Sequence, residues 1–216
     1  MQRLSLAITV GLLALATGAP RAQAPVVTVA QVTVAADQPG PAISPTMFGI
    51  FFEDINFAAD GGLYPERVKN RSFEFPEALM AWKKSANPDA QGEFAVRTEK
   101  PASPTNPHYL RLTSRAGRYG VTNDGFRGVS VEAGKQYVVT MLARRISSAA
   151  SLTVGIENAR MEPFGEATIG TLPAEWGTVT ATITPPVTTT RGRFRVRLDG
   201  PGQVDIDMVS VMPADT

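Results

Sequence analysis

Apolar and polar residues alternate along most of the second half of the chain, and this pattern predicts β-strands. Side chains of a strand point to opposite faces in turn, so alternating apolar residues share one buried face. Three segments show the pattern most clearly, with these apolar members: Tyr137, Val139, Met141 and Ala143; Val179, Ala181 and Ile183; Phe194, Val196 and Leu198. Arg193, Arg195 and Arg197 occupy the other face of the last segment, and we expect them to point outward.

From about Gly92 onward, short strand patterns follow one another and are separated by Gly, Pro and Asn turns. No segment after residue 85 keeps a helical period over three turns. About eight to ten short strands at this spacing predict an all-β fold, a jelly-roll β-sandwich of two antiparallel sheets. We assign it to residues 80–216.

The first part of the chain has a different pattern. Residues 26–34, VVTVAQVTV, predict a strand, and Asp37, Pro39, Gly40 and Pro41 then predict a linker. Residues 47–52 are almost continuously apolar, which is typical of a strand buried on both faces in a parallel sheet. Because neither strand has an evident partner for its backbone groups, we expect residues 26–75 to pack loosely against the sandwich.

Residues 1–24 have the three parts of a secretory signal peptide. Arg3 is followed by an apolar run over residues 4–16, and Ala22 and Ala24 provide small residues for cleavage. The apolar run is shorter than the roughly 20 residues that cross a membrane. We therefore expect a secreted or periplasmic protein that leaves the membrane after cleavage.

The composition excludes several classes of function. Lys and Arg number 21 and Asp and Glu 20, so no basic field attracts nucleic acid. The absence of cysteine excludes disulfides, thiolate metal sites and a cysteine nucleophile. His108 is the single histidine and suits a structural hydrogen bond better than catalysis. We expect no cofactor and no metal site.

Three consecutive blocks carry a resemblance to a known family: GIFFEDIN at residues 49–56, DGGLY at 60–64 and NRSFE at 70–74. They resemble the N-terminal signature of α-L-arabinofuranosidases of glycoside hydrolase family 51. The resemblance implies that residues 25–79 contain the first strand of an incomplete TIM-type barrel. It also implies that Glu53, at the end of that strand, binds the arabinose of the substrate. Without the resemblance, we would favour the interpretation that Glu53 and Asp54 only end a strand and cap the next turn.

Residues 80–216 resemble the CenC-type carbohydrate-binding module that is inserted into the same enzymes. The matching segments are NPHYLRL at 106–112, GVTNDGFRGVSV at 120–131 and DIDMVSVMPADT at 205–216. In this resemblance the partner is an arabinose-containing polysaccharide, such as arabinoxylan or arabinan.

Retaining glycoside hydrolysis needs two carboxyl groups about 5 Å apart. The family's two catalytic glutamates belong to later barrel strands, beyond the residues that this sequence contains. We therefore expect no catalytic residue in the chain, and no hydrolysis by the chain alone.

Exposed aromatic rings are the candidates for stacking on sugar rings. We predict this role for Tyr119, Phe126 and Trp82, and we assign Tyr137 and Trp176 to the core. Asp205 and Asp207 suit either a structural calcium or cross-strand pairing with Arg195 or Arg197, of which we favour the pairing.

Three interpretations remain open on the sequence alone. The chain is a truncated arabinofuranosidase-like protein that retains polysaccharide binding, or a part of a split or longer active enzyme, or a structural β-sandwich of the cell envelope without sugar affinity. The sequence leaves the oligomeric state and the particular glycan undetermined.

Overall fold

The computed structural model describes residues 32–35, 37–38, 40–49, 51, 53, 55, 59–147 and 151–216. The backbone divides into two units, Met1–Phe51 and Phe52–Thr216.

In the first unit, the described residues of the two predicted strands form no strand. Residues 32–34, 47–49 and 51 have no strand pairing, and Val32, Phe48 and Phe51 are exposed. A strand needs a partner for its backbone N–H and C=O groups, and the described part of this unit supplies none. Residues 26–31, 50 and 52 of the predicted strands lie outside the described residues.

The second unit contains eleven strands and no helix in its described residues. They are β1 Trp82–Ala86, β2 Gln91–Arg97, β3 Tyr109–Ala116, β4 Arg118–Asn123, β5 Val129–Val131, β6 Tyr137–Arg145, β7 Ser151–Glu157, β8 Pro163–Ile169, β9 Gly177–Ile183, β10 Thr189–Asp199 and β11 Gly202–Pro213.

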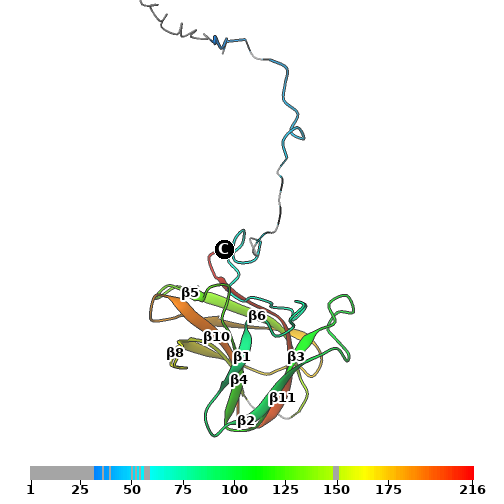
Figure 1. Cartoon of the computed structure of the whole chain (residues 1–216), viewed down its shortest axis with the longest axis vertical. Helices are drawn as coiled ribbons and strands as arrows, with labels where there is room; N and C mark the ends of the chain where they lie inside the picture. Colours follow the sequence, from blue (N-terminus) through cyan, green and yellow to red (C-terminus); the bar gives the residue numbers. More distant parts are fainter. Residues whose placement is uncertain are drawn as a thin grey trace, which may run out of the picture. The chain divides into compact units, whose positions relative to one another are not determined.

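The strands form two antiparallel sheets, and the prediction of an all-β sandwich is confirmed (Figure 1). One sheet has the order β1-β4-β10-β7-β8, with β5 paired to β10, and the other has the order β2-β3-β11-β6-β9. Neighbours in each sheet come mostly from distant parts of the sequence. The fold therefore depends on long-range pairing rather than on a series of hairpins.

The apolar faces of the two sheets meet in one core. The predicted inward residues of β6 and β10 are all buried, as are Val179 and Ile183 on β9. The largest side chains of this core include Tyr137, Phe194 and Leu110. Alternation along these strands thus predicted the buried faces correctly.

The arginines of β10 differ from the prediction. Arg195 and Arg197 point away from the core, but they are only 2% and 8% exposed. Arg195 donates to Glu157 at 2.9 Å and to Glu166 at 2.5 Å; Glu157 lies on the adjacent strand β7, and Glu166 lies on β8, the next strand beyond it. Around Arg195 and Arg197, the outer face of this sheet is therefore a layer of paired charges and not a solvated surface.

A β-bulge changes the direction of the side chains in the last strand. The pairing of β11 with β6 shifts between Asp207 and Ser210, and Met208 has a positive φ of 49°. Val204 and Ile206 are buried before the bulge and Val209 and Val211 after it. The extra residue keeps the apolar side chains inward although their spacing changes from two to three residues.

Hydrogen bonds of Glu66 and its neighbours connect the segment before β1 to the last strand, β11. β3 pairs with β11 only as far as Ile206, and the edge beyond is occupied by residues 66–71. Val209 N donates to Arg71 O at 2.9 Å, and Arg67 N donates to Val211 O at 3.0 Å. Glu66 is 1% exposed, and its Oε1 accepts from Val211 N at 2.9 Å.

The expectation of loose packing up to residue 75 is therefore wrong for residues 66–75. Their backbone groups find partners on the otherwise open edge of β11. Val68 and Phe73 are fully buried and belong to the core of the sandwich.

Two asparagines connect the NRSFE block to the sandwich. Asn123, at the end of β4, accepts from Lys69 N at 3.2 Å and donates to Lys69 O at 2.8 Å. Asn70 donates to Ala78 O at 3.0 Å and accepts from Phe75 N at 3.3 Å. Asn123 is completely buried, so these bonds replace the water that its amide would otherwise require.

We predict that Glu66→Ala lowers the free energy of unfolding by about 3 kcal/mol or more. The substitution leaves Val211 N, Ser210 Oγ and other buried donors without their acceptor. Urea denaturation of the whole chain measures the loss. Glu132→Ala, which removes an exposed glutamate paired with Lys135, should change stability by less than about 0.5 kcal/mol. Equal losses in the two variants would contradict the role given to Glu66.

Candidate functional site

The outer face of the sheet that contains β11 carries a buried ion cluster at its centre. Asp205 on β11 lies between Arg111 on β3 and Arg144 on β6, its neighbours in the strand register. Arg111 donates to it through Nε at 2.7 Å and Nη2 at 2.8 Å, and Arg144 through Nε at 2.8 Å. Asp205 is fully buried. The hydrogen bond to Asp205 raises the pKa of Arg111, so this guanidinium keeps its positive charge.

This cluster corrects the predicted pairing of Asp205 with Arg195 or Arg197. β10 and β11 belong to different sheets, and therefore those arginines cannot be cross-strand neighbours of Asp205. The sequence indicated that an arginine would pair with Asp205, but the partners could be identified only from the strand order.

Two aromatic rings enclose Arg144. Its guanidinium lies 5.2 Å from the ring centroid of Tyr109 and 4.7 Å from that of Trp176. The two rings meet edge to face, with centroids 5.3 Å apart. Trp176 Nε1 and Arg144 Nη1 donate to Lys100 O at 3.0 and 2.9 Å. These contacts fix the orientation of the Trp176 ring.

Trp176 is half-buried, and its assignment to the core is wrong. It stands immediately before β9 and shares a face with Thr178, two residues further along. Tyr109, whose ring contacts Trp176, is fully buried. Trp176 is therefore the aromatic residue of this cluster that reaches solvent.

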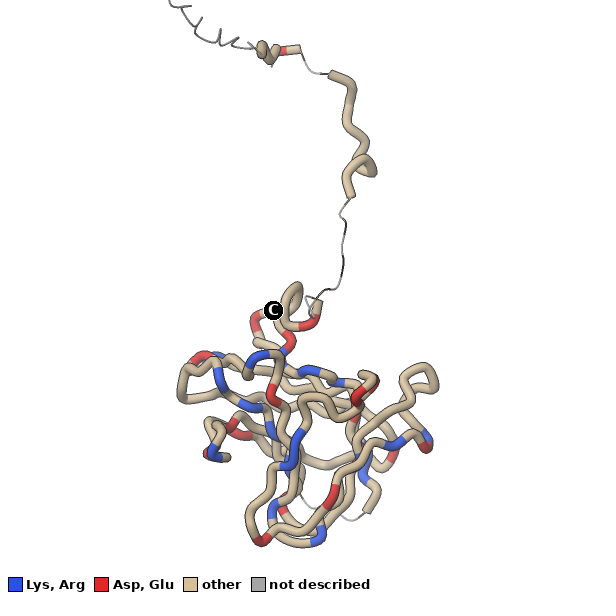
Figure 2. The backbone as a smooth tube through the Cα atoms, viewed as in Figure 1, with Lys and Arg blue, Asp and Glu red and all other residues tan. Residues whose placement is uncertain are grey.

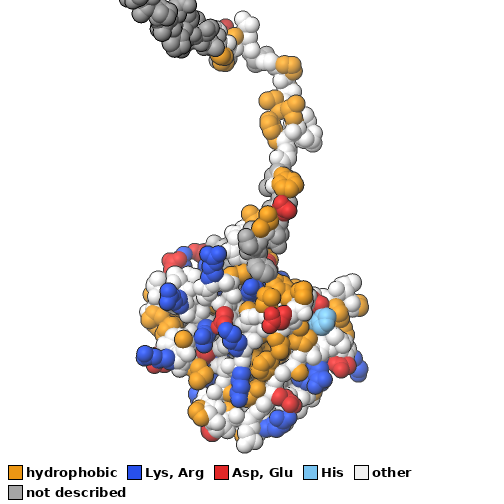
Figure 3. All heavy atoms as spheres, viewed as in Figure 1, with side chains coloured by type: hydrophobic (Ala, Val, Ile, Leu, Met, Phe, Trp, Pro, Cys, Tyr) orange, Lys and Arg blue, Asp and Glu red, His pale blue; other side chains and the backbone are white. Residues whose placement is uncertain are grey.

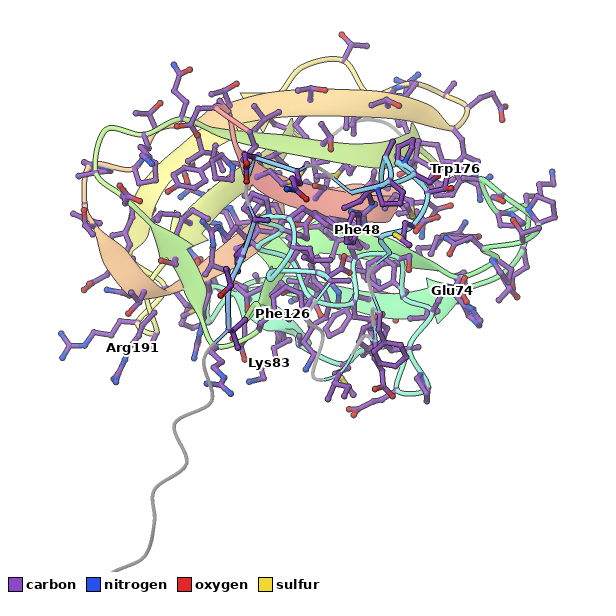
Figure 4. All side chains as sticks on the ribbon, turned by 90° about the horizontal axis from the view of Figure 1, so that it is seen from above. Phe48, Glu74, Lys83, Phe126, Trp176 and Arg191 are labelled. Atoms are coloured by element: carbon purple, nitrogen blue, oxygen red, sulfur yellow. The ribbon has the colours of Figure 1, made fainter. Side chains whose placement is uncertain are left out.

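A shallow hollow of about 270 Å³ lies on the same face of the sheet. Its lining combines hydroxyl groups, thioethers and one guanidinium: Arg71, Thr140, Met141, Leu142, Thr178, Met208, Ser210 and Met212. The bulge at Met208 forms part of its wall, and Arg71 is held there by Glu66 at 3.3 Å. We call Trp176 together with this hollow the Trp176 face. Figure 4 shows Trp176 and Glu74 on the same side of the domain.

A buried carboxyl group lies beside the bulge. Asp207 is 1% exposed and accepts from Met208 N at 2.7 Å and from Asn106 Nδ2 at 3.4 Å. Burial, with a smaller contribution from the charge of Glu74, raises the pKa of Asp207 to about 6, although the hydrogen bonds and the charge of Arg71 lower it. Burial thus outweighs the hydrogen bonds that favour the carboxylate.

His108 has the structural role that the sequence indicated. Its backbone N–H donates to Glu74 Oε1 at 2.8 Å, and its Nδ1 lies within hydrogen-bond distance of the other carboxylate oxygen. Figure 3 shows this histidine in pale blue next to an acidic side chain, at the edge of a band of apolar side chains.

Two of the predicted sugar-stacking residues are buried, so the expectation of exposed rings is wrong for both. Trp82 is 4% exposed, packs against Phe73 with ring centroids 5.2 Å apart, and donates through Nε1 to Asn70 O at 3.0 Å. Tyr119 is 3% exposed, and burial raises its pKa. Trp82 is the first residue of β1 and Tyr119 the second of β4, and both rings belong to the core of the sandwich.

Phe126 is half-buried in the loop between β4 and β5. Its ring lies so close to Gly61 that a Cβ there would approach it to 2.8 Å, and Gly61 has a positive φ of 77°. Phe126 therefore covers the turn of the DGGLY block.

Glu53 is exposed, and Asp54 lies outside the described residues. The substrate-binding role of Glu53 therefore stays a prediction that rests on the resemblance.

The described residues provide no site for a metal ion and no membrane helix. No three acidic or histidine side chains among them are arranged to hold a metal. None of the described residues belongs to a helix of the length and apolarity that a membrane crossing requires.

Comparison with known proteins finds relatives that are named α-L-arabinofuranosidases. The chain is 37% identical over 220 residues to an extracellular exo-α-L-arabinofuranosidase of Streptomyces chartreusis, a match that covers 98% of this chain and 25% of the relative. It is 30% identical over 192 residues to α-L-arabinofuranosidase 1 of Arabidopsis thaliana, with 82% of this chain and 28% of the relative covered. The chain spans about a quarter of the length of the curated relatives it matches.

A solved structure of an arabinose-bound MgGH51 α-L-arabinofuranosidase is also similar. It aligns with a TM-score of 0.67 at 27% identity, covering 75% of this chain and 28% of that one. No family model matches the chain.

We predict that the stability of the protein falls between about pH 4 and pH 7 through Asp207. A carboxyl group whose pKa is higher in the folded state favours folding while it is protonated, and this contribution is lost as pH rises through the folded pKa. A rise from 3.8 to about 6 corresponds to roughly 3 kcal/mol. Asp207→Asn is neutral throughout, so its stability relative to the parent should increase by up to that amount over the range.

Urea denaturation at a series of pH values measures the difference. The matched control is Asp89→Asn, which replaces an exposed aspartate in the turn between β1 and β2. A parent and an Asp207→Asn variant with parallel pH profiles would show that Asp207 titrates normally.

Proposed function

We propose that the chain binds an arabinose-containing polysaccharide through the Trp176 face, as the carbohydrate-binding part of an α-L-arabinofuranosidase. The observation that carries the proposal is the fixed Trp176 ring beside a hollow lined with hydroxyls and a guanidinium. The names of the similar proteins support the substrate class.

The arrangement suits a sugar for two reasons. A flat aromatic ring offers its face to the C–H groups of a sugar ring, and Trp176 loses little entropy on binding because Arg144 and Lys100 already hold it. Thr140, Thr178 and Ser210 offer hydroxyls that donate and accept, as sugar hydroxyls require.

The polymer that we propose is of the arabinoxylan or arabinan type. We also propose that residues 1–24 act as a secretion signal and that the protein works outside the cytoplasm, where such polymers occur. The name of the Streptomyces relative, an extracellular enzyme, supports this location.

We predict that the parent protein is retarded in affinity electrophoresis on arabinoxylan or arabinan and that Trp176→Ala weakens binding about 10-fold, equivalent to about 1.4 kcal/mol. Tyr64→Ala, which removes a partly exposed aromatic ring that does not line the hollow, should bind like the parent. Phe126→Ala tests the earlier candidate in the same gels.

A second variant separates binding from folding. Thr178→Val keeps the shape and strand preference of the residue but removes a hydroxyl from the hollow. It should weaken binding at an unchanged urea midpoint. Absence of retardation of the parent on either polymer would overturn the proposal and favour a β-sandwich without sugar affinity.

The role of Glu53 forms a separate part of the proposal. We propose that it contacts arabinose when the rest of a catalytic barrel is present, and that the 216-residue chain alone releases no p-nitrophenol from p-nitrophenyl α-L-arabinofuranoside. Glycoside hydrolysis needs a pair of suitably spaced carboxyl groups, and Glu53 with its neighbour on one strand would face opposite sides. Release above background that is lost in Glu53→Gln would show an active site within this chain.

A further inference from the structure

A second hollow lies near the start of β10, in the sheet that does not carry the Trp176 face. It has a volume of about 240 Å³ and is lined by Asp124, Arg127, Gly128, Arg191, Gly192 and Arg193, which we call the arginine hollow. The three arginines come from the β4–β5 loop and from β10. Figure 2 shows Lys and Arg positions close together where β5 and β10 meet.

The charges around this hollow are unbalanced. Arg127, Arg191 and Arg193 line it, and Lys83 on β1 binds the same carboxylate, Asp124, that Arg193 approaches. Four cations and one carboxylate leave a local charge of +3, whereas the whole chain has a net charge of +1. The excess is therefore a local feature of this surface.

Asp124 neutralises only part of the positive charge. Its carboxylate forms an ion pair with Lys83 and lies 3.2 Å from Arg193 Nε. Within the described residues, the guanidinium groups of Arg127 and Arg191 form no ion pair, and both residues are exposed. Figure 4 shows Arg191 and Lys83 projecting from the domain on the side away from Trp176. Two forked donors are thus available to an external anion.

Two glycines bring the backbones on either side of this hollow close together. Gly128 has a φ of 102°, and a Cβ there would collide with Thr190 O; a Cβ on Gly192 would approach Val129 O to 2.8 Å. Only glycine at these two positions allows the end of the β4–β5 loop and the start of β10 to approach so closely. The close approach places Arg127 beside Arg191 and Arg193 in the lining of the hollow.

We propose that the arginine hollow binds the carboxylate of a uronic acid residue in an acidic polysaccharide. The polymer class rests on the proposed function, whereas the requirement for an anion rests on the unpaired arginines alone. A carboxylate matches the bidentate geometry of a guanidinium. A hollow of six residues accommodates one charged sugar but lacks the extended basic surface that several nucleic acid phosphates would need.

The two sites have separate tasks in this arrangement. The Trp176 face belongs to the sheet of β6, β9 and β11, and the arginine hollow to the sheet of β10. Neutral arabinose-bearing chains need stacking, whereas a uronate needs positive charge. A polymer that carries both kinds of residue would contact the domain at two places.

The test compares polygalacturonate oligosaccharides with neutral arabinan, by isothermal titration or affinity electrophoresis at low salt. The double variant Arg127→Gln/Arg191→Gln should bind the acidic oligosaccharide about 10-fold more weakly, since each exposed ion pair contributes a factor of about 2 to 5. Its binding to arabinan should not change. The acidic binding of the parent should also weaken as salt is raised to about 0.5 M.

The matched control is Arg97→Gln/Arg160→Gln, which removes the same charge from two exposed arginines outside the hollow. Equal weakening by both double variants would overturn the proposal by showing a general charge effect. Equally tight binding of double-stranded DNA, or no binding of the acidic oligosaccharide, would also overturn it. Trp176→Ala should weaken arabinan binding only, so failure of the neutral site and failure of the arginine hollow are distinguishable.

Discussion

The pairing of the last strand with the segment around Glu66 is the constraint on which the rest of this domain depends. β11 is the central strand of its sheet, but β3 is too short to cover its second half. One carboxylate resolves this by accepting from the N–H groups of Arg67, Val68 and Val211 and from Ser210 Oγ. The two segments are 145 residues apart in sequence, so the start of the domain is held only when its end has folded.

The bulge that begins this half of β11 also shapes the Trp176 face. It restores Val209 and Val211 to the core and thereby directs Met208, Ser210 and Met212 toward the hollow. A regular strand would have placed these two valines on the outer face. The same register change leaves Asp207 buried, with a backbone N–H and an amide as its hydrogen-bond donors. Core packing and the chemistry of the outer face are therefore set by one extra residue.

Alternation predicted the fold and the buried faces because period-two patterns report directly on strands. It could not separate exposed from buried aromatics, since Trp82, Tyr119 and Trp176 all stand at strand ends, where the two faces are not defined by the pattern. Trp82 packs against Phe73 and Tyr119 lies in the core, whereas contacts with Arg144 and Lys100 hold Trp176 nearer the surface. The role of Glu66 was hidden for a similar reason, because its partners lie at the far end of the chain. The spacing of the valines in β11, in contrast, was a visible sign of the bulge.

The arginines show why residue type alone did not reveal the candidate sites. Arg195 and Arg197 alternate with core residues as surface charges do, yet Asp199 on the same strand, Glu157 on β7 and Glu166 on β8 neutralise them. Toward the start of the same strand, Arg191 has no such carboxylate beside it, because β5 is only three residues long and contributes Val129, Ser130 and Val131. The neighbouring strand thus decides whether an arginine stabilises the fold or remains available to a ligand. On β10 both outcomes occur within seven residues.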